Sequence, residues 1–294
     1  MPVDEAKIRA TFQKLNRQLS KLTETASASN VHKFRTYGRR VEALVEELVP
    51  GLKRKDRRLL KQLARLRKKG GKVRDLDVQI AALRGLKLPQ EGGRKAQLLR
   101  VLSDDRTSRE KKLEKAFDKQ QVSQLRKGLK RSAARIDVPN TTEELLDRAM
   151  RPVLQLGANQ RPLTEKRVHQ YRIVGKRARY LAEVAGDDPH AKELIEQLKR
   201  MQDVIGDWHD WLKLTERAEE VFDGTRSSAL IAALRNITRA KYRQSLDVLV
   251  ETRAAQTPRK PISTEISAPK LPYREADRSH LEFSPELGAS AALN

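Results

Sequence analysis

The chain has 294 residues, no cysteine, and 62 Lys and Arg against 39 Asp and Glu, so its formal net charge is +23. The lack of cysteine excludes disulfides, thiolate metal sites and a cysteine nucleophile, and it fits a reducing compartment. The charge exceeds what solubility needs and opposes compaction, so we expect a polyanionic partner. Only 4% of residues are aromatic, which argues against recognition by base stacking.

Nearly everything up to about residue 251 has the 3.6-residue periodicity of amphipathic helices, and no segment alternates like a strand. Clusters of Gly, Pro, Asn, Asp and Ser predict where these helices end. In chain order, the expected breaks are 27–30, 50–51, 70–71, 89–93, 137–140, 157–162, 186–189 and 223–224. The sequence therefore predicts an all-α fold.

One segment occurs twice. Residues 31–46 read VHKFRTYGRRVEALVE and residues 168–183 read VHQYRIVGKRARYLAE. Identical residues at matched positions include a Val, a His, two Arg, a Gly, a Leu and a Glu. Such a match rarely arises by chance, so it indicates two halves that present the same chemistry.

On a helix, each copy of this segment has a basic stripe opposite an apolar face. The stripe contains His32, Arg35 and Arg39 in the first copy, and His169, Arg172 and Lys176 in the second. An ordinary solvated face is the alternative interpretation of one such helix. The recurrence of histidine at the same register favours anion binding instead.

A second match follows at an offset of 135 residues, close to the offset of 137 in the first. It pairs the expected helices 53–69 and 72–86 with 189–204 and 207–222, and it pairs Arg65 with Arg200. We therefore expect a module over residues 1–251, with halves at about 1–135 and 141–251. Residues 252–294 carry scattered prolines and are expected to form a mostly disordered tail.

These motifs together resemble the CHAD domain, a histidine-containing α-helical family. The resemblance rests on the two His motifs, on GxxRDxDV at residues 71–78, and on QDxIGDxxD at residues 202–210. It implies two pseudo-symmetric four-helix bundles that form one module and bind inorganic polyphosphate on a basic surface between the halves. Glu42 departs from the family pattern, which often has a basic residue there, so weaker binding by the first half is expected. No triphosphatase signature ExExK is visible near the start, which suggests a stand-alone module.

The chemistry of phosphate supports this assignment, because Arg donates in parallel to phosphate oxygens and a bound phosphate favours the imidazolium form of His. The candidate polyphosphate-binding residues combine the two stripes with neighbouring basic positions. They are His32, Arg35, Arg39, Arg40, Arg65, His169, Arg172, Lys176, Arg179 and Arg200.

Two other functions stay open. A nucleic-acid-binding, nucleoid-associated protein would explain the charge, and a metal-dependent phosphohydrolase could use His32, His169 and the repeated aspartates Asp75, Asp77 and Asp210. A structural role of those aspartates, at a helix N-terminus or in a salt bridge, is the favoured interpretation. No catalytic motif, metal site or cofactor site is recognised, so no enzyme activity is expected. Neither a signal peptide nor a membrane span is evident, so we expect a cytoplasmic protein, with association with polyphosphate granules as a further expectation.

Overall fold

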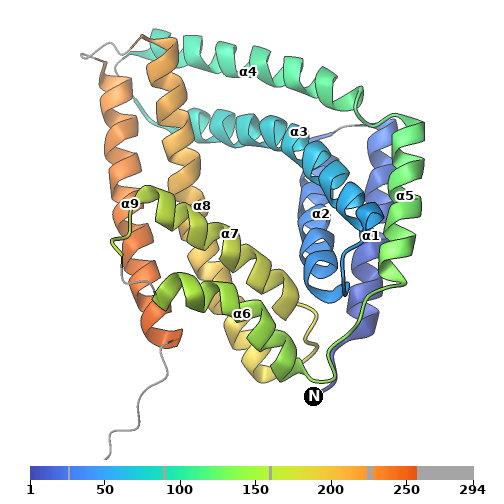
Figure 1. Cartoon of the computed structure of the whole chain (residues 1–294). Coiled ribbons are helices and arrows are strands. Elements are labelled where there is room, and N and C mark those ends of the chain that lie inside the picture. Colours follow the sequence, from blue (N-terminus) through green and yellow to red (C-terminus); the bar gives the residue numbers. More distant parts are fainter. Residues whose placement is uncertain (26, 89–90, 159–160, 224–227, 257–294) are drawn as a thin grey trace, which may run out of the picture. The chain divides into compact units, whose positions relative to one another are not determined.

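The computed structural model describes residues 1–25, 27–88, 91–158, 161–223 and 228–256 (Figure 1). Within these ranges the chain forms nine α-helices and no strand, which confirms the all-α prediction. The helices are α1 (Glu5–Glu24), α2 (Ala28–Leu48), α3 (Arg54–Gly85), α4 (Gly92–Glu114), α5 (Lys119–Ala133), α6 (Thr142–Ala158), α7 (Glu165–Ala182), α8 (Pro189–Val221) and α9 (Ala229–Gln256).

The break expected at 70–71 is wrong, and so is the division of 189–222 into two helices. The helices predicted at 53–69 and 72–86 are one continuous helix, α3, although each interior glycine costs about 1 kcal/mol relative to alanine. Buried residues continue across the Gly70-Gly71 pair, from Leu66 to Val73 and Leu76. This packing holds the helix together. In the same way, α8 joins the expected helices 189–204 and 207–222 and carries Gly206 in its interior.

The helices fall into two groups along the chain. In the first group, α1 packs on α2, α2 on α3, α3 on α5 and α5 on α1, which closes a ring of four helices. The second group consists of α6, α7, α8 and α9, packed in chain order. α4 is an additional helix that lies on α3, as Figure 1 shows. Between the groups, α2 packs on α7 and α3 packs on α8.

Two hydrophobic clusters form the core. The larger one contains buried residues from both groups of helices, such as Phe34 of α2 and Trp208 of α8. The smaller one joins the C-terminal part of α3 to α4, α8 and α9, with Leu83, Leu102 and Leu214 among its buried residues. Each cluster therefore draws on both halves of the chain.

The C-terminal boundary differs from the expected one. α9 continues past residue 251 to Gln256, because Arg253 donates a 2.9 Å hydrogen bond to the carbonyl of Gly157 and Thr252 donates to Val248. The rest of the expected tail, 257–294, lies outside the described residues. Among the helices described, none is both long and apolar enough to cross a membrane.

Candidate anion-binding site

A cavity of about 410 Å³ lies where α2, α3 and α7 meet, and we call it the central cavity. Polar and charged side chains form most of its lining. The lining residues are Arg39, Glu42, Ala43, Glu46, Arg67, His169, Arg172, Ile173, Lys176, Arg177 and Tyr180. Four of the ten candidate residues therefore come together here: Arg39, His169, Arg172 and Lys176.

Lys176 is the most perturbed cation of the central cavity. Its pKa is lowered to about 6, first by burial and then by the positive charges of Arg172 and Arg39, while the charge of Asp210 acts in the opposite direction. Neither Arg39 nor Arg172 nor Lys176 forms an ion pair with a described carboxylate, whereas Arg67 and Arg177 do. Basic groups held this close together without a carboxylate partner favour any anion that enters, because the anion stabilises their protonated forms.

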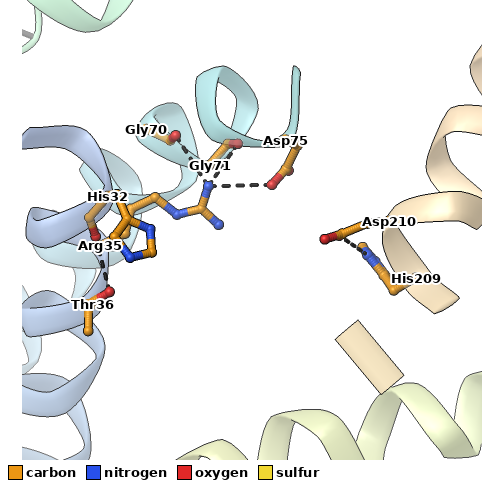
Figure 2. Close-up of polar contacts among 8 residues, drawn as sticks. All are labelled: His32, Arg35, Thr36, Gly70, Gly71, Asp75, His209 and Asp210. Atoms are coloured by element: carbon orange, nitrogen blue, oxygen red, sulfur yellow. Dashed lines mark hydrogen bonds and ion pairs between the residues drawn. The ribbon is translucent and has the colours of Figure 1, made fainter. Parts of the chain in front are cut away.

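Arg35 does not line the cavity but is held against α3, as Figure 2 shows. Its Nη1 donates to the carbonyls of Gly70 and Gly71, at 3.3 and 2.9 Å, and lies 3.4 Å from the carboxylate of Asp75. Only 14% of its side chain is exposed. A side chain at position 70 would press on Val31 of α2, so the first glycine permits this approach.

Arg172 has matching neighbours in the second half. Its guanidinium lies against Gly206 of α8, and the charge of Asp210 acts on it as that of Asp75 acts on Arg35. Burial lowers the pKa of both arginines. The Nε of Arg172 is buried without a hydrogen-bond partner among the described residues. Because the side chain of Arg172 lines the central cavity, its positive charge acts on any anion that enters.

The two motif histidines have different surroundings. His169 lines the cavity and stacks on His209 of α8, with ring centroids 5.3 Å apart. His32 is exposed near the start of α2. The pKa of each is lowered, first by desolvation and then by nearby cations, which are Arg74, Arg35 and Lys33 for His32. For His169, the charge of His209 lowers the pKa more than the charge of Arg172 does.

Arg40 and Arg179 are engaged with protein groups. Arg40 donates to Glu183 of α7 at 2.7 Å, and its guanidinium lies over the rings of Tyr37 and Tyr180. Arg179 lies 3.5 Å from the same Glu183. Arg40 therefore joins α2 to the end of α7, whereas the contact between Arg179 and Glu183 lies within the last turn of α7.

Arg65 and Arg200, paired by the sequence repeat, lie away from the central cavity. Arg65 is exposed and lines hollows on another face of α3. Arg200 is exposed on α8 and forms a 2.8 Å ion pair with Glu251 of α9. The helical periodicity placed them on a polar face but did not show which neighbours that face meets.

Glu42 is buried at the cavity and paired with Arg67 at 2.8 Å, and burial raises its pKa. The first half therefore carries a carboxylate at the position equivalent to Arg179. Arg67 was missed by the sequence reasoning. If residues 53–86 are read as one helix, Arg67 lies one turn before Gly71 and on the same face. That face carries the start of the GxxRDxDV motif, so Arg67 would then be a candidate. His209 was also missed, although it lies inside the QDxIGDxxD motif.

The repeated aspartates have protein partners. Asp75 contacts Arg35, Asp77 lies 2.7 Å from Arg106 of α4, and Asp210 faces the neighbouring ring of His209 (Figure 2). In the part of the chain that the structure describes, no three His, Asp or Glu side chains gather closely enough to hold a metal ion.

Comparison with known proteins identifies the fold. The family model of the CHAD domain matches residues 6–219. The crystal structure of the CHAD domain from the plant Ricinus communis is similar with a TM-score of 0.65 at 16% identity, over 86% of this chain and 90% of that one. PptA from Streptomyces chartreusis is similar with a TM-score of 0.62 at 15% identity, over 87% of this chain and 99% of that one. At such identities the likeness shows the fold alone. No curated protein sequence matches significantly.

Proposed function

This chain belongs to the CHAD domain family, and we propose that it binds inorganic polyphosphate in the central cavity. The observation that carries the proposal is the convergence of Arg39, Arg172 and Lys176 from α2 and α7 on one cavity without described carboxylate partners. Lys176 has a pKa of about 6 there, so the free site bears a cost that a bound anion would relieve.

Polyphosphate fits this site better than nucleic acid does. It is a thin chain of phosphates that needs only charge and hydrogen-bond donors, and Arg and Lys provide both. The cavity has one Phe, Tyr or Trp side chain, Tyr180, which is buried beneath Arg40 and Arg179, and the ring of His169 is already stacked on His209. Base stacking, on which single-stranded nucleic-acid binding relies, therefore has no exposed Phe, Tyr or Trp in this cavity. We assign the protein no catalytic role.

Calorimetric titration with sodium polyphosphate, and with duplex DNA at equal phosphate concentration, tests the proposal. We expect polyphosphate to bind more tightly, with an affinity that falls log-linearly with salt concentration. Lys176→Met and Arg39→Gln should each weaken binding about tenfold or more, because a charged hydrogen bond contributes about 1.5–3 kcal/mol.

The matched control is Lys111→Gln, which removes one exposed charge on α4 from a position outside the central cavity. It should change the affinity less than about twofold. Equal effects of Lys111→Gln and Lys176→Met would show that binding depends on net charge alone, and preferential binding of DNA would favour the nucleic-acid alternative.

A further inference from the structure

Three hollows follow one another along the outer side of α3, with volumes of about 270, 370 and 480 Å³. Gln62 lines the first and the second, while Arg65 and Lys69 line the second and the third. The three hollows therefore form one continuous groove. On α3 it is bounded by Lys55, Arg58, Gln62, Arg65, Lys69 and Lys72, and we call it the outer groove.

The outer groove is separate from the central cavity. Its residues form one stripe on α3, whereas Arg67, which lines the cavity, lies roughly 160° away around the helix at 100° per residue. From Lys55 to Lys72 the stripe runs about 26 Å at 1.5 Å per residue. The opposite wall comes from α5 and α4, and includes Lys127, Arg131, Arg109 and Lys112.

The charge of this groove is not compensated. No acidic residue lines any of the three hollows. Within the described part of the chain, none of its lysines or arginines forms an ion pair, while many other basic side chains of the protein do, Arg106 and Arg217 among them. A row of like charges along one groove is repulsive unless a polyanion occupies it.

The equivalent face of the second half lacks this row of basic residues. At the offset of 135 residues, Arg58 and Lys72 correspond to Glu193 and Asp207 of α8, and Lys69 corresponds to Val204. Arg65 corresponds to Arg200, which is neutralised by Glu251. The unpaired basic stripe is thus a property of α3 and not a general consequence of a basic composition.

The shape of the groove selects the kind of polyanion. Its floor is apolar, with Leu59, Leu66 and Leu125, and no aromatic residue lines it. Helices α3 and α5 meet closely beneath it, since a side chain at Gly128 would lie 3.0 Å from Leu59. A groove with basic walls and an apolar floor offers a phosphate chain charge and hydrogen-bond donors, whereas stacked bases would find no aromatic platform.

We propose that the outer groove binds a second run of a linear inorganic polyphosphate chain, independently of the central cavity. The ligand is that of the proposed function, on which this inference rests for its chemistry, but the site is different. Its cations contact successive phosphates of the chain and displace condensed counterions, so binding in the groove depends on salt as well.

The test compares three variants with the wild type by titration with short, size-fractionated polyphosphate. The groove variant Arg58→Gln/Arg65→Gln/Lys69→Gln changes three exposed side chains on one stripe. The central variant is Lys176→Met. The control variant Lys21→Gln/Lys111→Gln/Lys166→Gln removes the same charge from exposed positions that line none of these hollows. Circular dichroism checks that all remain helical.

We expect two binding sites for the short chain in the wild type and in the control variant. The groove variant should keep one site, and its affinity for long chains should fall about tenfold or more. A groove variant indistinguishable from the control variant overturns this inference and leaves the central site standing. Loss of all binding in the groove variant, with none lost in Lys176→Met, instead overturns the proposal for the central cavity. The groove would be assigned to nucleic acid if the wild type binds duplex DNA and only the groove variant loses that binding while its polyphosphate binding stays intact.

Discussion

The Nε of Arg40 lies 2.7 Å from the carboxylate of Glu183, which joins α2 to α7. The repeat equivalents of these residues, Arg177 and Glu46, form an ion pair of 2.9 Å in the reverse direction. Each half thus gives its arginine to the glutamate of the other. This exchange is the contact pattern of two units related by a two-fold axis. Superposition of 1–135 on 141–251 remains the direct test of the predicted duplication.

Reversing the charges of one of these pairs tests its contribution to stability. Arg40→Glu and Glu183→Arg should each lower the free energy of unfolding by about 1–3 kcal/mol, because each leaves like charges facing one another in a partly buried contact. The double variant should recover at least half of the loss, as measured by urea denaturation. A double variant no more stable than the two single variants would show that the geometry, with Tyr37 and Tyr180, admits only the native orientation.

Lys176→Met should stabilise the free protein while it weakens polyphosphate binding. The pKa of Lys176 is about 6 in the folded chain and about 10.5 when the group is solvated, so the unfolded state binds more protons between these values. Stability therefore rises with pH across this window, and at pH 7 the lysine costs free energy that methionine does not. Thermal unfolding should show a melting temperature about 3–8 °C higher at pH 7. If the gain in melting temperature disappears above about pH 10.5, its cause is the protonation of Lys176 in the unfolded chain. A lower melting temperature of the variant at pH 7 would contradict this explanation.

Affinity for polyphosphate should rise as pH falls from about 9 to about 6. In the free site, Arg172, Arg39 and Arg35 lower the pKa of Lys176, and Asp210 raises it. A bound phosphate adds negative charge, so it raises the pKa of Lys176 toward its ordinary value. Binding therefore takes up a proton across this window. Calorimetry in buffers of different ionisation enthalpy measures the number of protons, and Lys176→Met should abolish the uptake at about pH 8.

The histidines should act in a lower pH range, because the pKa values of His32 and His169 lie below 6.5 in the free protein. His32→Gln/His169→Gln should leave the proton uptake at about pH 8 intact and reduce it near pH 6. Parallel pH profiles of this double variant and the wild type would assign both histidines a structural role.

The two motif glycines should respond oppositely to alanine. A Cβ at Gly38 meets nothing within 4 Å, whereas one at Gly175 would overlap the terminal methyl of the fully buried Met201. Gly38→Ala should stabilise the protein by about 0.5–1 kcal/mol through helix propensity. Gly175→Ala should destabilise it by roughly 1 kcal/mol, because Met201 must move in a packed core. Denaturant midpoints measure both, and equal shifts of the same sign would contradict the contact.

The all-α fold could be predicted from the sequence, whereas the repeat pairing of His32, Arg35 and Arg39 with His169, Arg172 and Lys176 stays a prediction until the two halves are superposed. Helical periodicity places apolar and basic faces directly, and the family resemblance indicated the topology. The partners of Arg40 and Arg177 could not be predicted, because their ion pairs join residues 143 and 131 positions apart. Local propensity predicts a break at the Gly70-Gly71 pair, because it does not register the tertiary contact that the pair makes with Arg35.

The two hydrophobic clusters have a consequence for how the chain unfolds. Because α3 and α8 each contribute to both clusters, neither half buries its apolar residues without the other. The backbone also joins the ends of the halves, since Thr142 donates to the carbonyl of Met1 and Asp4 donates to that of Val184. The repeats visible in the sequence are therefore not independent folding units. Cutting the chain between residues 135 and 141 would leave two fragments that become structured only on association, and the intact helical module should melt in a single cooperative transition.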